Sequence, residues 1–195
     1  MNHLAHLFLS QQDINLMVGN FIADHIRGKE IEQFSEEVQE GIRMHRAIDH
    51  FTDHHPIVIQ SKERLYPKYH KYAAVIVDMF YDHILAKNWK DYSPIPLKSF
   101  TQSAYKMLKA QEASFNERSI KTLNHMSTHD WLSNYANLEG MKKAMNGLSH
   151  RASFVSKMEE SVDDLERDFL LYEAEFKSFF KELFEYCANW SSSSK

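Results

Sequence analysis

The segment KYAAVIVDMFYDHILAKNW, from Lys71 to Trp89, is apolar on nearly every side of a helical wheel. A helix of this kind is stable only when other elements surround it, so the segment predicts a central, buried helix. The chain of 195 residues holds only 5 Gly and 4 Pro, too few for the many tight turns of a β-sandwich. An all-α bundle packed around this segment is therefore expected.

Helical periodicity recurs along most of the chain, with apolar residues three and four positions apart. Asp13 is suited to cap the first of these helices, and Pro56 is suited to close the second. The predicted helices are Asp13 to Arg27, Glu36 to Thr52 or slightly beyond, Lys71 to Trp89, Leu97 to Gln111, Trp131 to Leu148 and Phe154 to Ala188. The pattern weakens from Glu112 to Asp130. About six or seven helices are expected, in a single domain over residues 1–190, with 191–195 as a frayed tail.

Several features bear on where the protein works and what it contacts. Cys187 is alone and cannot form an internal disulfide, and MNHLAHLFLS lacks the basic start of a signal peptide. No segment approaches the roughly 20 apolar residues of a membrane helix. We therefore expect a cytoplasmic protein that does not enter a membrane. The net charge of −4 argues against a general nucleic-acid binder.

Basic side chains gather in one part of the chain, at Lys62, Arg64, Lys68, His70 and Lys71. A local cluster of cations can dock an acidic partner protein, and such docking is weakened by salt. The cluster is equally consistent with an ordinary solvated surface.

Aspartates on apolar helix faces are the strongest chemical signal in the sequence. Asp78 and Asp82 both project from apolar faces of the predicted central helix, and Asp24 lies between apolar neighbours in the first helix. A buried carboxylate without a partner destabilises the fold, so each needs cations or hydrogen-bond donors. A salt bridge to Arg46 or Arg27 would satisfy one of them, and a bound metal ion would satisfy several.

Histidine and aspartate also gather in the stretch MHRAIDHFTDHHP. At about 100° per residue, His45, Asp49 and Asp53 fall within about 80° of one another, at the edge of the apolar face. The other three histidines of the stretch point away from that row and are expected at the surface or at a helix cap. His6 lies among leucines near the start of the chain, where it is either a core residue or a ligand.

Three or four separate helices thus each present Asp or His from an otherwise apolar face, as a metal cage within a bundle requires. Imidazole and carboxylate without thiolate suit Mn²⁺, Mg²⁺ or Fe²⁺, with Zn²⁺ possible. Such ions activate bound water and neutralise the charge of phosphoryl oxygens, so the sequence predicts hydrolysis of a phosphate ester. Motifs of P-loop, Rossmann, α/β-hydrolase and zincin proteins are absent.

Four blocks of sequence, MNHLAHLFLS, GNFIADHIRG, GIRMHRAIDHFTDHHP and VDMFYDHILAKNW, resemble the acyl carrier protein phosphodiesterase family in order and spacing. This family is distantly related to the His-Asp (HD) phosphohydrolases, and the resemblance spans roughly Met1 to Trp89. It implies an HD-domain-like, cytoplasmic enzyme that uses a divalent metal, most often Mn²⁺, with Mg²⁺ or Fe²⁺ as alternatives. Its substrate would be holo-acyl carrier protein. Hydrolysis of the phosphodiester between serine and 4′-phosphopantetheine would give apo-acyl carrier protein and 4′-phosphopantetheine.

The family pattern and the helical geometry select the same residues. The predicted metal ligands are Asp24, His45, Asp49, Asp78 and Asp82. The predicted catalytic residues are His83 and His6, as proton donors to the leaving serine, and Arg46, as a fork that binds phosphoryl oxygens. Residues expected to orient the ligands or bind substrate are Asn2, Asn20, Arg27 and Asp53.

Two alternatives stay open from the sequence. An HD-like phosphohydrolase of the same fold could act on a nucleotide or another small phosphate ester. A non-catalytic bundle could use the histidines to bind haem or a structural metal.

Overall fold

The computed structural model describes residues 1–190, and every regular element within them is a helix, which confirms the all-α class. The α-helices are α1 (His3–Leu9), α2 (Ile14–Ile22), α3 (Glu36–His54), α4 (Pro56–Tyr69), α5 (Ala73–Lys87), α6 (Leu97–Ala110), α7 (Glu117–Thr128), α8 (Trp131–Asn134), α9 (Leu138–Arg151), α10 (Ser161–Arg167) and α11 (Phe169–Ala188). The 3₁₀ helices are η1 (Ala23–His25), η2 (Gly28–Gln33), η3 (His70–Tyr72), η4 (Trp89–Asp91), η5 (Glu112–Ser114) and η6 (Met158–Glu160). The predicted tail, residues 191–195, lies outside the described part of the chain.

The described residues contain more helices than the six or seven predicted, because two long predicted helices are interrupted. The first breaks between α8 and α9, where the side chain of Asn137 caps α9 by accepting from the Gly140 amide. The second breaks at Asp168, between α10 and α11, and it also loses its start, since Phe154 and Val155 are exposed and lie outside any helix. The short helices α1 and α7 and the helix α4 were not predicted.

Local side chains explain where the early helices begin. Asp13 caps α2, as predicted, by accepting hydrogen bonds from the amides of Asn15 and Leu16. Pro56 does more than close α3, because it is also the first residue of α4, where its missing N–H costs no hydrogen bond. Only His55, in an extended conformation, separates α3 from α4.

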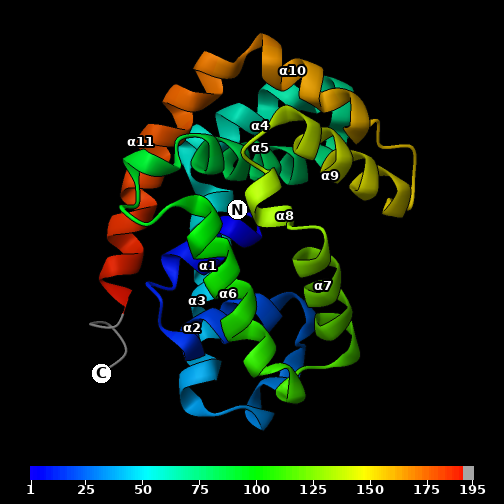
Figure 1. The fold of residues 1–195 in the computed structure, drawn as a ribbon. Coiled ribbons are helices and arrows are strands. Elements are labelled where there is room, and N and C mark those ends of the chain that lie inside the picture. The colour runs from blue at the N-terminus through cyan, green and yellow to red at the C-terminus, as the bar shows by residue number, and fades with distance from the viewer. Residues whose placement is uncertain (191–195) are drawn as a thin grey trace.

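Helix α5 lies at the centre of the core, as its composition predicted. Its buried residues include Ile76, Phe80 and Ile84, and it contacts α1, α4, α9 and α11. In Figure 1, α11 runs along one side of the bundle and the amino terminus lies in the middle of the molecule. No helix within residues 1–190 is both long and apolar enough to cross a membrane.

Helices α2 and α3 pack more closely than any other pair in the described chain, and two glycines permit it. A Cβ on Gly41 would lie 2.6 Å from the carbonyl oxygen of Leu16 and 2.9 Å from Cα of Gly19. These obstacles are backbone atoms, which cannot move aside as the end of a flexible side chain can. The close approach sets Asn20 of α2 beside His45 of α3, and this pair organises the site.

Candidate metal centre

Two histidines and an aspartate from two helices converge on one point. His6 of α1 and His45 of α3 are 3% and 6% exposed, and their rings stack with centroids 4.0 Å apart. Asp49, one turn after His45 on α3, places Oδ1 3.2 Å from Nε2 of His6 and Oδ2 3.2 Å from Nε2 of His45. The three ligand atoms all lie within 4.8 Å of one another. These nitrogen and oxygen atoms form a compact group of possible ligands that suits a metal ion.

Asn20 fixes the orientation of both imidazoles. Its side-chain Oδ1 lies 3.1 Å from Nδ1 of His6, and its backbone oxygen lies 2.9 Å from Nδ1 of His45. Both partners are carbonyl oxygens and can only accept, so each ring donates from Nδ1. The Asn20 amide is itself held by donation to Oγ of Ser10, which donates to the backbone oxygen of His6. Both Nε2 atoms are therefore directed into the same space.

The environment of His6 indicates what that space would hold. Because its Nδ1 carries the proton, neutral His6 has a lone pair on Nε2, and this atom has no hydrogen-bond partner within residues 1–190. The nearest acidic atom, Oδ1 of Asp49, is also an acceptor. Two acceptors 3.2 Å apart are satisfied by a cation between them, and ligand atoms bound to one Mg²⁺-sized ion lie about 3 Å apart. The residues present therefore fit a divalent metal.

Asp24 extends this cluster from η1. Its Oδ1 lies 3.2 Å from Nε2 of His45, whereas the other ring nitrogen, Nδ1, donates to the backbone oxygen of Asn20. The side chain is 56% exposed, so it can reorient more freely than the buried imidazoles. A cavity of about 350 Å³ opens over the four residues and gives a small ligand room to reach them.

The electrostatics of the cluster give His6 and His45 different charges. Although burial opposes a charge on His45, hydrogen bonds to Asp24 and Asp49 raise the pKa of its imidazole to about 9. The hydrogen bond from His45 lowers the pKa of Asp24 to about 2. Although burial opposes the charge of Asp49, the hydrogen bond from His45 holds the pKa of this carboxyl well below its usual range. Burial and the neighbouring His45 lower the pKa of His6. Without metal, His45 carries the positive charge and His6 stays neutral.

Three further predicted residues line the same cavity, namely Asn2, Asp53 and Asp78. Asp78 comes from α5, as predicted, but its Oδ1 accepts from the Met1 amino group at 2.9 Å. Burial opposes the charge of that amino group, whereas Asp78 and the nearby Asp49 and Asp82 raise its pKa. Asp53 pairs with Lys62 at 2.6 Å. Asp78 and Asp53 add negative charge near the cluster, but each is already paired with a cation, the Met1 amino group and Lys62 respectively.

Asp82 lies away from this cavity. Its side chain is fully buried and accepts from the amides of Asn2, Leu4 and Ala5, at 3.3, 2.8 and 3.3 Å. These are the free N–H groups at the start of α1, so the carboxylate acts as a helix cap supplied by α5. The predicted need for a partner is met by backbone donors, and a metal-ligand role for Asp82 has no support in this geometry.

The predicted catalytic residues His83 and Arg46 do not line the cavity, and neither does Arg27, which was expected to orient the ligands or bind substrate. His83 is buried and donates from Nδ1 to the backbone oxygen of Tyr135 at 2.6 Å, which directs it toward α8. Arg46 and Arg27 are exposed, and Arg46 donates to the backbone oxygen of Ile26 at 3.4 Å. Helical periodicity indicates on which face of a helix each residue lies, but not which other helix packs against that face.

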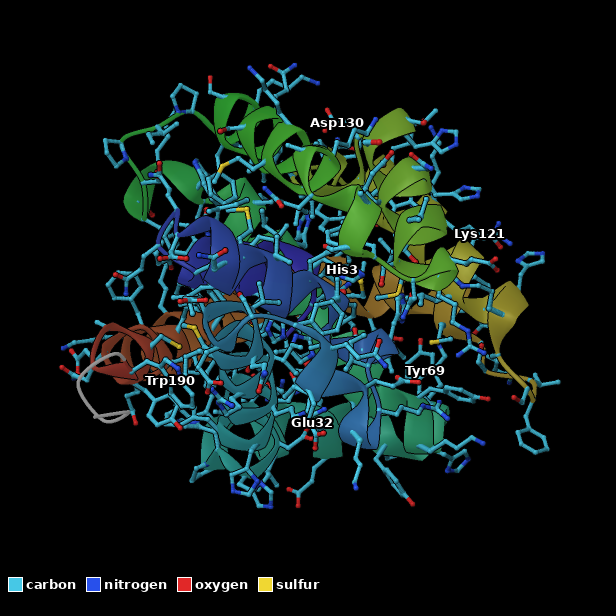
Figure 2. The ribbon with its side chains drawn as sticks, turned by 90° about the horizontal axis from the view of Figure 1, so that it is seen from below. His3, Glu32, Tyr69, Lys121, Asp130 and Trp190 are labelled. Atoms are coloured by element: carbon cyan, nitrogen blue, oxygen red, sulfur yellow. The ribbon has the colours of Figure 1, made fainter. Side chains whose placement is uncertain are left out.

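One histidine that lines the cavity was not among the residues predicted for the site. His3 lines it, and Figure 2 shows this residue near the middle of the molecule. Burial lowers the pKa of His3 to about 4, so its ring is neutral at neutral pH. The signal was present, because His3 precedes His6 by three positions and so shares its helix face.

The basic cluster of the sequence is largely paired within the molecule. Lys62 binds Asp53, Arg64 binds the buried carboxylate of Glu175, and Lys68 lies 3.1 Å from Asp164 and 3.2 Å from Glu160. Lys71 lies over the ring of Phe154 at 4.1 Å. Cations neutralised in this way contribute little to an attractive field, so docking of an acidic partner through this cluster is weakly supported.

Comparison with known proteins agrees with the resemblance seen in the sequence. The family model described as acyl carrier protein phosphodiesterase matches residues 1–183. A protein of that name from Photorhabdus laumondii subsp. laumondii is 31% identical over 190 residues, covering 97% of this chain and 96% of the relative. One from Escherichia coli O6:H1 is 31% identical over 186 residues, covering 95% and 96%. No solved structure shows a significant match, so the HD-like topology stays a prediction. Because the family model and these relatives match nearly the whole chain, the chain belongs to the acyl carrier protein phosphodiesterase family.

Proposed function

We propose that this protein is a metal-dependent phosphodiesterase that hydrolyses the link between 4′-phosphopantetheine and a serine of holo-acyl carrier protein. The products would be apo-acyl carrier protein and 4′-phosphopantetheine. The substrate class is supported by the names of the relatives. The observation that carries the metal dependence is the convergence of the His6 and His45 Nε2 atoms on Asp49, with both Nδ1 atoms bonded to oxygens of Asn20.

The chain contributes the ligands and their orientation. His6, His45 and Asp49 would hold the ion, and Asp24 would complete the set from η1. When bound, a divalent ion such as Mn²⁺ lowers the pKa of water and neutralises charge on phosphoryl oxygens. Asn20 keeps each imidazole in the tautomer that binds metal. His3, neutral and on the cavity wall, is placed to exchange a hydrogen bond with the bound phosphodiester.

The two alternatives left open by the sequence differ in how well they suit this geometry. His6 and His45 stack with their ring centroids 4.0 Å apart, which leaves no space for a haem held between the two rings. A bundle that binds haem through this pair of histidines is therefore disfavoured. The other alternative, a small phosphate ester as substrate, would use the same metal centre. Only an experiment distinguishes it from the carrier protein as substrate.

The direct test is incubation of the protein with holo-acyl carrier protein and Mn²⁺, followed by intact mass measurement of the carrier. We expect loss of the mass of phosphopantetheine and recovery of the free prosthetic group. A parallel panel of nucleotides and other phosphate esters should give slower release. If the carrier keeps its mass while a nucleotide is hydrolysed rapidly, the substrate assignment is wrong although the metal centre stands.

Variants link the activity to the proposed ligands. His45→Ala and Asp49→Asn should each lower kcat/KM by at least 100-fold, and metal content measured on the purified protein should fall in parallel. His50→Gln is the matched control, because His50 lies exposed on the same helix and outside the cavity. Full activity of Asp49→Asn, with normal metal content, would remove this cluster from the mechanism.

A further inference from the structure

A second and larger cavity, of about 560 Å³, adjoins the metal centre. It lies between α8, α9 and the first residues of the chain. Asn2, His3 and Leu148 line both cavities, so the two spaces meet at these side chains. The volume falls within the range of about 300–1,000 Å³ that is typical of small-molecule sites. A ligand bound at the metal centre could therefore extend into it.

The walls of this second cavity combine apolar surface with the exposed amide side chains of Asn134 and Asn137, and the charged residues Glu139, Lys143 and Arg151 also line it. Trp131, Tyr135 and Leu148 supply the apolar part. Asn134 donates from Nδ2 to the backbone oxygen of His129, which leaves its Oδ1 without a partner within residues 1–190. Asn137 accepts at Oδ1 from the Gly140 amide, which leaves its Nδ2 without one in the same part of the chain. A free acceptor and a free donor on one wall are what a ligand with amide groups requires.

We propose that this cavity binds the pantetheine part of the prosthetic arm while the phosphodiester lies at the metal centre. The proposal deepens the proposed function and rests on it. The arm is a slender chain with two amides, a hydroxyl and a dimethyl group, which matches a wall of mixed apolar and amide character. Because the arm is joined directly to the phosphate, the junction at Asn2 and His3 is where it would pass from one cavity to the other.

Such a subsite would give the enzyme its selectivity. The phosphodiester alone offers few contacts that distinguish a carrier protein from any other phosphate ester. Contacts made away from the reacting bond can position the substrate and so raise the rate for the correct one. The arm cavity, defined by Trp131, Tyr135, Asn134, Asn137 and Leu148, is large enough for contacts of that kind.

Gly147 provides a clean way to fill the arm cavity. It lines the cavity from α9, and a Cβ at this position would meet no atom within 4 Å. A large side chain there can occupy the cavity without a clash with the backbone. Asn146→Phe is the matched control, because Asn146 is exposed on the same helix and does not line the cavity.

The first readout compares two substrates. For Gly147→Phe we expect the ratio of kcat/KM for holo-acyl carrier protein to that for bis(4-nitrophenyl) phosphate to fall at least tenfold, while Asn146→Phe keeps the wild-type ratio. An unchanged ratio for Gly147→Phe overturns the arm subsite. Failure of the wild-type protein to act on any carrier overturns the proposed function instead, so the two failures are distinct.

The second readout does not depend on activity. Titration of the protein with free 4′-phosphopantetheine should change the fluorescence of Trp131, and Trp131→Phe should abolish the change. The apparent Kd should rise at least tenfold in Gly147→Phe and stay unchanged in Asn146→Phe. Binding of equal strength to wild type and Gly147→Phe would overturn the assignment of the cavity.

Discussion

The imidazole rings of His6 and His45 stack 4.0 Å apart, although they come from different helices, and the same residue, Asn20, accepts a hydrogen bond from each. Stacking alone would leave the rings free to turn. The two bonds to Asn20 remove that freedom and direct both Nε2 atoms toward Asp49. The site is therefore organised before any ligand binds, which lowers the cost of ordering it.

Asn20→Ala should weaken metal binding because His6 loses the acceptor for its Nδ1, whereas the backbone oxygen that holds His45 remains. Loss of such an orienting contact typically costs about 10–100-fold in metal affinity. Isothermal titration with Mn²⁺ measures the change. The control is His54→Gln, an exposed position on α3. An Asn20→Ala protein with wild-type affinity would show that the orientation of His6 is immaterial.

Metal affinity should rise with pH. The pKa of His45, about 9 in the metal-free protein, lies above the ordinary 6.5, so the ring is protonated at neutral pH and must lose that proton to bind metal. Below pH 9 the apparent affinity should increase by about tenfold per pH unit, with release of one proton. Titrations in buffers of different ionisation enthalpy measure this proton. Affinity that is constant between pH 6.5 and 8.5 would contradict the protonated state of His45.

Asp82 should make the stability of the protein fall as the pH rises. Burial raises its pKa to about 7, above the ordinary 3.8, so the folded state holds an extra proton between these values. The stabilising effect of that proton is fully present below pH 3.8 and is lost as the pH rises through 7. Between these two values the contribution of Asp82 to the free energy of unfolding should fall by about 1.4 kcal/mol per pH unit, and above pH 7 it should level off.

Denaturant unfolding at several pH values between 4 and 7 tests this effect. Asp82→Asn should flatten the slope of unfolding free energy against pH, while Asp163→Asn, at an exposed position, should keep it. Metal content should be normal in Asp82→Asn, because the carboxylate caps α1 and does not face the cluster. Loss of metal from a folded Asp82→Asn protein would restore the ligand role that the sequence suggested.

His83→Gln separates a catalytic role from a structural one. His83 donates to the backbone oxygen of Tyr135 and lines neither cavity. The variant should keep its turnover rate within about threefold of wild type and lose about 1 kcal/mol of stability, the typical worth of a hydrogen bond. Steady-state kinetics with holo-acyl carrier protein and thermal unfolding measure the two effects. Turnover that drops by two orders of magnitude while stability stays unchanged would favour the proton-donor role.

Asp78 and Asp82 show which features of the site could be predicted from the sequence and which could not. Helical periodicity correctly placed both on the most buried helix and indicated that buried carboxylates need partners. Their partners, the Met1 amino group and the amides that begin α1, lie 77 and 78 positions away along the chain and are brought near only by the tertiary fold. The pattern on one helix does not encode which element packs against it. His45 and Asp49 could be paired in advance because they lie one turn apart on the same helix.

The close packing of α2 against α3 should be essential for the metal centre. In Gly19→Ala the new Cβ would lie 2.6 Å from Cα of Gly41, and because this atom belongs to the backbone the helices must separate. Overpacking of this kind costs roughly 1–3 kcal/mol. The separation also moves Asn20 away from His45, so metal affinity should fall together with the free energy of unfolding. Gly147→Ala, a helical glycine with open space around its Cβ, should instead gain roughly 0.4–1 kcal/mol. A Gly19→Ala protein as stable as wild type would mean that the glycine contact does not hold α2 and α3 in register.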